Sequence, residues 1–173
     1  MRTTIKSLFI SLLLIAPPGL SVCAQPTHQQ AGLRTGFTGG LFYQMTHETG
    51  NAETGYMAML SFRNHGIQVT GLRTIYVTSL DEISPDLYLG WGYGGHAGFI
   101  ITNNIGFLGD RYYFRNERFC PLIGFDGWGT IEYRFRSIPM TLSLNIKPYI
   151  ELTFPSFINL MPGDIGISIA YAF

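Results

Sequence analysis

Hydrophobic and polar residues alternate along most of this chain, and the C-terminal segment shows the pattern most clearly. From 164 to 173 the even positions are small or polar, and the odd positions are Ile165, Ile167, Ile169, Tyr171 and Phe173. A strand turns successive side chains to opposite faces, so one face of this segment is apolar throughout. Alternation of this kind is typical of a strand with lipid on one side and a barrel lumen on the other.

The same alternation recurs in six further segments, which predicts seven visible strands. The segments span 33–45, 54–63, 67–77, 87–101, 123–136 and 140–152. In the third segment the phase slips at Gly71 and Leu72, which predicts a β-bulge. Residues 103–122 are expected to form a loop rich in aromatic residues and arginine, which suits either a binding surface or an aromatic girdle.

Seven strands cannot close a single-chain bacterial barrel, since such barrels have an even number of strands. The tight connections at 64–66 and 137–139 are both expected on the periplasmic side, where turns are short. An even number of strands must then lie between them, and three are visible. The eighth strand is expected within 105–114, or from a fold-back at Gly94–Gly95. The reversed orientation needs a strand before Leu33, where 25–32 is polar and short. The prediction is an all-β protein, an eight-stranded antiparallel transmembrane β-barrel.

The N-terminus has the pattern of a secretory signal peptide over 1–24. Arg2 and Lys6 precede an apolar run at 8–16, and Val22-Cys23-Ala24 fits a cleavage site before Gln25. The apolar run is too short for a transmembrane helix. A short periplasmic segment is expected at 25–32 and the barrel at 33–173. Lipidation of Cys23 is the alternative.

The composition suits a barrel that faces lipid. Charged residues make up 13% of the chain, against about 25% in soluble domains. A soluble β-sandwich is the alternative. The chain has 11 basic and 11 acidic residues, so its net charge gives no reason to expect nucleic acid as a partner. After signal cleavage Cys120 is the one remaining cysteine. It cannot form an intramolecular disulfide, and it lacks neighbours at metal-ligand spacing.

An eight-stranded barrel has a lumen just wide enough for its own side chains. Charged residues at inward positions therefore need partners. We expect a structural polar network in the lumen, and an ion or proton path is the alternative. The members of this network are Arg34, His96, Asp126, Glu132, Arg134, Lys147 and Glu151.

Candidate chemistry is sparse. His96 could act as a general base, but the residue two positions later is Gly98. A lipid A deacylase of the small-barrel type has serine there. The glycines at 90–98 alternate within a strand and do not precede a helix, so they do not form a phosphate loop. No catalytic, cofactor-binding or metal-binding residue is expected.

Five segments resemble small outer-membrane β-barrel proteins of the Bacteroidetes type, within the wider OmpX-like and OmpA-like group. They are 32–37 (GLRTGF), 89–99 (LGWGYGGHAGF), 123–127 (IGFDG), 131–135 (IEYRF) and 165–173 (IGISIAYAF). The resemblance implies an outer-membrane monomer with a structural or surface-interaction role and no catalysis. The implied partners are membrane lipid, lipopolysaccharide, the barrel-assembly machinery and periplasmic chaperones. Tyr171 and Phe173 resemble the C-terminal signal that this machinery recognises. An enzyme acting on lipid A or acyl chains, or a narrow pore, is the alternative.

Overall fold

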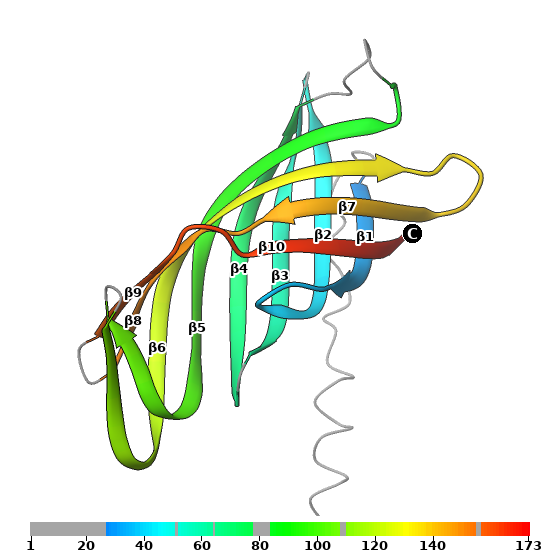
Figure 1. Ribbon diagram of the computed structural model, residues 1–173. Helices are drawn as coiled ribbons and strands as arrows, with labels where there is room; N and C mark the ends of the chain where they lie inside the picture. Colours follow the sequence, from blue (N-terminus) through cyan, green and yellow to red (C-terminus); the bar gives the residue numbers. More distant parts are fainter. Residues whose placement is uncertain (1–26, 51, 64, 78–83, 108–109, 155–156) are drawn as a thin grey trace, which may run out of the picture.

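The computed structural model describes residues 27–50, 52–63, 65–77, 84–107, 110–154 and 157–173 (Figure 1). No helix in these ranges is long and apolar enough to cross a membrane. The ranges contain ten strands: β1 (Thr27–Arg34), β2 (Gly39–Thr49), β3 (Ala52–Arg63), β4 (Gly66–Val77), β5 (Leu87–Phe107), β6 (Asp110–Arg134), β7 (Met140–Ile146), β8 (Tyr149–Thr153), β9 (Phe157–Met161) and β10 (Ile165–Ala172).

The strands close into one antiparallel ring. Their order is β5-β4-β3-β2-β1-β10-β7-β6-β8-β9, and pairing of β5 with β6 closes the sheet. β7 and β8 both pair with β6, so they are one barrel strand interrupted at Lys147 and Pro148. β9 and β10 likewise continue each other around 162–164, since they pair with β8 and β7. The barrel therefore has eight strands, which confirms the predicted fold class.

The eighth strand lies at the start of the barrel, so both expected locations for it are wrong. The predicted strand at 33–45 is the end of β1, a connection at 35–38 and then β2. β1 begins at Thr27, so the prediction that 25–32 is a periplasmic segment outside the barrel is wrong. That segment is polar because residues such as Gln30, which is 2% exposed, point into the lumen.

This position of the eighth strand also changes the orientation argument. Three strands, β4 to β6, separate the tight connections at 64–66 and 137–139. The two connections therefore lie at opposite ends of the barrel, and the prediction that they share one end is wrong. The end that carries 137–139 also carries the start of β1 and the end of β10, since Phe173 N donates to Gln29 O at 2.9 Å.

Residues 103–122 do not form the expected loop, and 105–114 is not a separate strand. These residues extend β5 and β6, whose pairing continues to Phe107 and Asp110 with a register shift between Thr102 and Asn104. Figure 1 shows this hairpin, with β8 and β9 beside it, extending beyond the other strands. The barrel thus carries a protruding sheet at the end opposite the start of β1 and the end of β10.

The bulge predicted at Gly71 and Leu72 is also absent. β4 pairs without interruption with β3 from Gly66 to Val77, and with β5 over the same residues. Leu72 points into the lumen at 3% exposure. Its neighbour Arg73 therefore lies on the outer face, where it is exposed.

Candidate functional site: the lumen network

An apolar cluster fills the middle of the lumen. It comes from five strands and contains Phe42, Met57, Met59, Leu72, Trp128 and Ala170. Met59 is 1% and Trp128 6% exposed. Because protein interiors pack with few voids as large as a water molecule, this cluster acts as a plug between two polar layers.

The polar layer near the start of β1 and the end of β10 is organised by Arg134, which lies at the end of β6. Its Nε donates to Glu132 Oε1 at 2.8 Å, and its two terminal nitrogens donate to Glu53 at 2.7 and 2.9 Å. The second oxygen of Glu132 accepts from Gln30 Nε2 and from the Tyr76 hydroxyl, each at 3.3 Å. These contacts connect β6 to β1, β3 and β4 across the lumen.

A buried ion pair between Arg34 and Asp164 lies on the other side of the plug. The two side chains are fully buried, with Arg34 Nη1 3.1 Å from Asp164 Oδ2. Arg34 Nε also donates to Asn145 Oδ1 at 2.6 Å. The Thr38 hydroxyl and the Phe37 backbone N–H donate to the Asp164 carboxylate. Asp164 sits in the interruption between β9 and β10, so this pair holds β1 and the 35–38 connection against that break.

His96 belongs to a third cluster, on the same side of the plug. Its Nδ1 lies 2.7 Å from Asp126 Oδ2, and Asp126 Oδ1 accepts from Lys147 Nζ at 3.1 Å. His96 Nε2 lies 3.4 Å from Glu151 Oε2 but makes no hydrogen bond in the described part of the chain. A Cβ at Gly124 would lie 2.5 Å from the His96 ring, so the glycine leaves room for it.

Glu151 is held across the lumen by Arg63 of β3. Arg63 Nη1 and Nη2 donate to Glu151 Oε2 and Oε1 at 2.6 and 3.0 Å. Asn159 also donates to Glu151 Oε1, at 3.2 Å. The Tyr149 ring packs edge-on to His96 with the ring centroids 5.6 Å apart. Paired, bidentate charges of this kind are the form in which a buried charge is tolerated.

The structure places all seven predicted network residues on the inner face. Six are buried, and Arg134 is half-buried at the strand end. Asp126 meets Lys147 and Glu132 meets Arg134, while Arg34 and Glu151 pair with residues outside the predicted set. The members that sequence reasoning missed are Gln30, Glu53, Arg63, Tyr76 and Asp164. Arg63 and Asp164 have inward parity in their predicted strands, whereas Gln30 and Glu53 fell outside the predicted strand bounds.

Tyr171 and Phe173 lie on the outer face at the end of β10. Their ring centroids are 6.4 Å apart, and Phe173 is also 6.4 Å from Tyr43 of β2. Phe173 therefore reaches across the outer face of β1 to Tyr43 of β2, and the three rings form an aromatic cluster at this end of the barrel.

The lumen offers little for chemistry. Among the described residues, no group of three or more His, Cys, Asp or Glu side chains could hold a metal ion. The pairing of His96 with Asp126 would orient an imidazole as a general base. However, His96 is 3% exposed and is enclosed by Asp126, Glu151 and Tyr149. The arrangement connects strands across the barrel through the contacts of His96 and Lys147 with Asp126 and of Arg63 with Glu151.

Comparison with known proteins supports the fold and goes no further. No protein-family model matches the chain, and neither does any curated protein. A solved structure that is similar is the crystal structure of the N-terminal β-barrel domain of OprF from Pseudomonas aeruginosa. The TM-score is 0.53 at 9% identity, over 86% of this chain and 98% of that one. The chain therefore has the fold of an outer-membrane-type β-barrel.

Proposed function

We propose that this protein is an integral outer-membrane β-barrel with a structural or surface-interaction role and no catalytic activity. The observation that carries the proposal is how its side chains are sorted. Large apolar residues on the outer face are exposed, as with Ile165 at 63% and Phe125 at 81%, while the charged network is buried inside. A closed barrel satisfies its backbone hydrogen bonds without water, which lets strands span lipid.

The proposed orientation puts the start of β1 and the end of β10 at the periplasmic side. The opposite end carries the protruding sheet of β5, β6, β8 and β9. Outer-membrane barrels have longer loops outside the cell, so this sheet is the part we assign to the cell surface. The connection at 137–139 is then periplasmic, and the one at 64–66 faces outward.

The plug and the ion pairs favour a structural lumen over a narrow pore. The apolar cluster around Met59 and Trp128 separates the two polar layers. An ion crossing it would lose its hydration without gaining a polar partner. The enclosure of His96 likewise favours a hydrogen-bonded lumen residue over the base of a lipid A or acyl-chain enzyme.

The remaining elements of the proposal follow from the resemblance. The protein is a small barrel of the Bacteroidetes type, exported by a cleaved signal peptide over 1–24. It is monomeric and uses the barrel-assembly machinery and periplasmic chaperones, for which Tyr171 and Phe173 supply the signal. Membrane lipid and lipopolysaccharide surround it.

Cysteine labelling in whole cells tests both insertion and orientation. His65 and Ser137 are exposed in connections at opposite ends, and Cys120 is buried. A membrane-impermeant maleimide should label His65→Cys on intact cells and Ser137→Cys after the outer membrane is permeabilised. Labelling of Ser137→Cys but not of His65→Cys on intact cells would show that the barrel has the opposite orientation. Equal labelling of both on intact cells would contradict insertion. Slower gel migration after boiling serves as the check that each variant is folded.

A further inference from the structure

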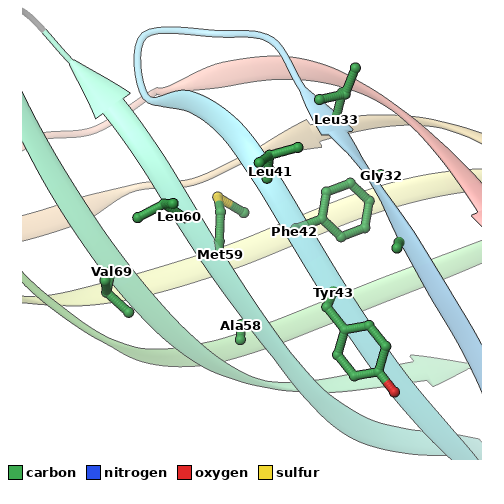
Figure 2. Close-up of a pocket in the computed structure, with 10 residues that line it drawn as sticks. Gly32, Leu33, Leu41, Phe42, Tyr43, Ala58, Met59, Leu60 and Val69 are labelled. Carbon is green, nitrogen blue, oxygen red and sulfur yellow. The ribbon is translucent and has the colours of Figure 1, made fainter. Parts of the chain in front are cut away.

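Three connected grooves mark the outer face of the barrel. The first, about 690 Å³, lies between the row Leu33, Leu41, Leu60 and Val69 and the pair Tyr43 and Ala58, as Figure 2 shows. The second, about 430 Å³, shares Tyr43 and Ala58 with it and extends to Gly71, Arg73 and Tyr93. The third, about 680 Å³, shares Val69 and continues over Gly95 and Ala97 to Phe125.

The floor of the second groove comes from small residues in one cross-strand row. Ala58 of β3 pairs with Gly71 of β4, and both line this groove. Gly71 also pairs with Gly95 of β5, which lines the third groove. Tyr43 of β2 closes the row at one end, since it pairs with Ala58. A Cβ placed on Gly71 would meet nothing within 4 Å. The surface is therefore hollowed at the position where neighbouring rows carry large side chains.

Arg73 stands at one wall of this groove. It pairs with Tyr56 on one side and Tyr93 on the other, which forms a Tyr–Arg–Tyr row next to the floor. Its side chain is exposed on the outer face. Within the described part of the chain it makes no ion pair or hydrogen bond, and it is the charged residue on the outer faces of β3, β4 and β5. A charge on a lipid-facing surface is unfavourable unless it reaches the interface or finds a counter-charge.

On the side away from Arg73 this groove adjoins the first groove, which Leu60 and Val69 line. Along the outer face of β4, Arg73 is followed by Gly71 and then by Val69. Val69 pairs with Leu60 of β3 and with Ala97 of β5. The groove thus runs from a cation and two phenolic rings to an aliphatic surface. The cation lies toward the end of the barrel that carries the start of β1 and the end of β10, because β4 ends there at Val77.

We propose that this groove holds one glycerophospholipid of the membrane leaflet nearest the start of β1 and the end of β10. The Arg73 guanidinium binds the phosphate, for which its planar donor fork is suited. The tyrosine rings lie at the level of the headgroup, where such amphipathic rings are favoured. One acyl chain lies over Ala58 and Gly71 toward Val69, that is, toward the middle of the membrane. This inference rests on the proposed function, since it needs the inserted barrel and its orientation.

The test measures lipid that remains bound to the full-length protein purified from outer membranes in a mild detergent. Phospholipid and lipid A per protein are counted by native mass spectrometry. Arg73→Gln removes the charge, and Gly71→Leu fills the floor at a position where an added Cβ meets nothing within 4 Å. Arg136→Gln is the matched charge control, since Arg136 is exposed near the same end but outside the groove. Ile167→Phe is the bulk control, on the outer face of β10.

Wild type and both controls should retain one phospholipid. Arg73→Gln should retain about tenfold less, as expected for loss of a charged hydrogen bond, and Gly71→Leu should also retain less, because its side chain occupies the place of the acyl chain. Equal retention by all five proteins would overturn the proposal, and so would retention of lipid A in place of phospholipid. Arg73→Lys should retain an intermediate amount, because it keeps the charge but loses the fork. Boiled and unboiled gel samples are run for each protein. A wild type that never shows the folded form contradicts the proposed function, whereas a folded barrel without lipid contradicts this inference alone.

Discussion

Removing the carboxylate of Asp164 should be among the most destabilising single changes in this barrel. Both side chains of the Arg34–Asp164 pair are fully buried, and the pair also organises Thr38 and the Phe37 backbone N–H. Asp164→Ala leaves the Arg34 guanidinium in the lumen without its counter-charge, although Asn145 still accepts from it. Breaking a buried pair from one side costs about 3–5 kcal/mol, and we expect a loss in that range.

The measurement is equilibrium unfolding by denaturant in lipid vesicles, followed by the fluorescence of Trp128. The Arg34 guanidinium carbon lies 5.6 Å from the Trp128 ring, so the indole reports directly on this region. A Trp91→Phe background removes the second tryptophan. Asp86→Ala is the control, since it breaks the exposed pair with Arg136, and exposed pairs contribute little to stability.

The combined Arg34→Met and Asp164→Leu variant separates pairing from packing. Replacing both charges by apolar groups avoids an orphaned charge, and such replacements are often neutral or stabilising. The double variant should recover most of the stability that Asp164→Ala loses. An Asp164→Ala barrel that unfolds at the same denaturant concentration as the Asp86→Ala control would refute the reasoning.

Three further predictions concern the plug, the histidine and the C-terminus. Wild-type protein in planar bilayers should give no steady current, whereas Phe42→Ala combined with Trp128→Ala should conduct, because the two rings are removed from the plug; steady current from wild type would favour a pore. His96→Ala should leave the lipid A mass spectrum of cells unchanged, and an altered spectrum would promote the enzyme alternative. Deletion of Phe173 should reduce the heat-shifted, membrane-inserted fraction in cells, and normal insertion without it would contradict the proposed assembly signal.

The inward and outward faces of the strands could be read from the sequence because alternation is a local rule. The faces predicted for 140–152 and 165–173 agree with the observed burial, including buried Lys147 and Glu151. The same rule concealed the eighth strand. Arg34 and Thr38 both point inward, so the 35–38 connection preserves the phase of the pattern. Two strands joined by such a connection look like one.

The site was less predictable, because ion-pair partners across a lumen depend on how the strands are staggered. Arg63 reaches Glu151 and Arg134 reaches Glu53, over separations of 88 and 81 residues. No local pattern encodes these distances. Arg73 was missed for a different reason: the supposed bulge at Gly71 removed any expectation of which face it occupies. Because β4 is regular, its side chains alternate without interruption, and Arg73 lies on the outer face.

The central claim is that one face of every strand contacts lipid while the other encloses the lumen, and the two tryptophans test it directly. Trp91 lies on the outer face at 50% exposure, and Trp128 is buried in the lumen at 6%. Single-tryptophan variants, Trp128→Phe and Trp91→Phe, are folded into vesicles whose acyl chains are brominated near the glycerol end. The account predicts strong quenching of Trp91 and almost none of Trp128. Equal quenching of the two, or quenching of neither, would contradict it.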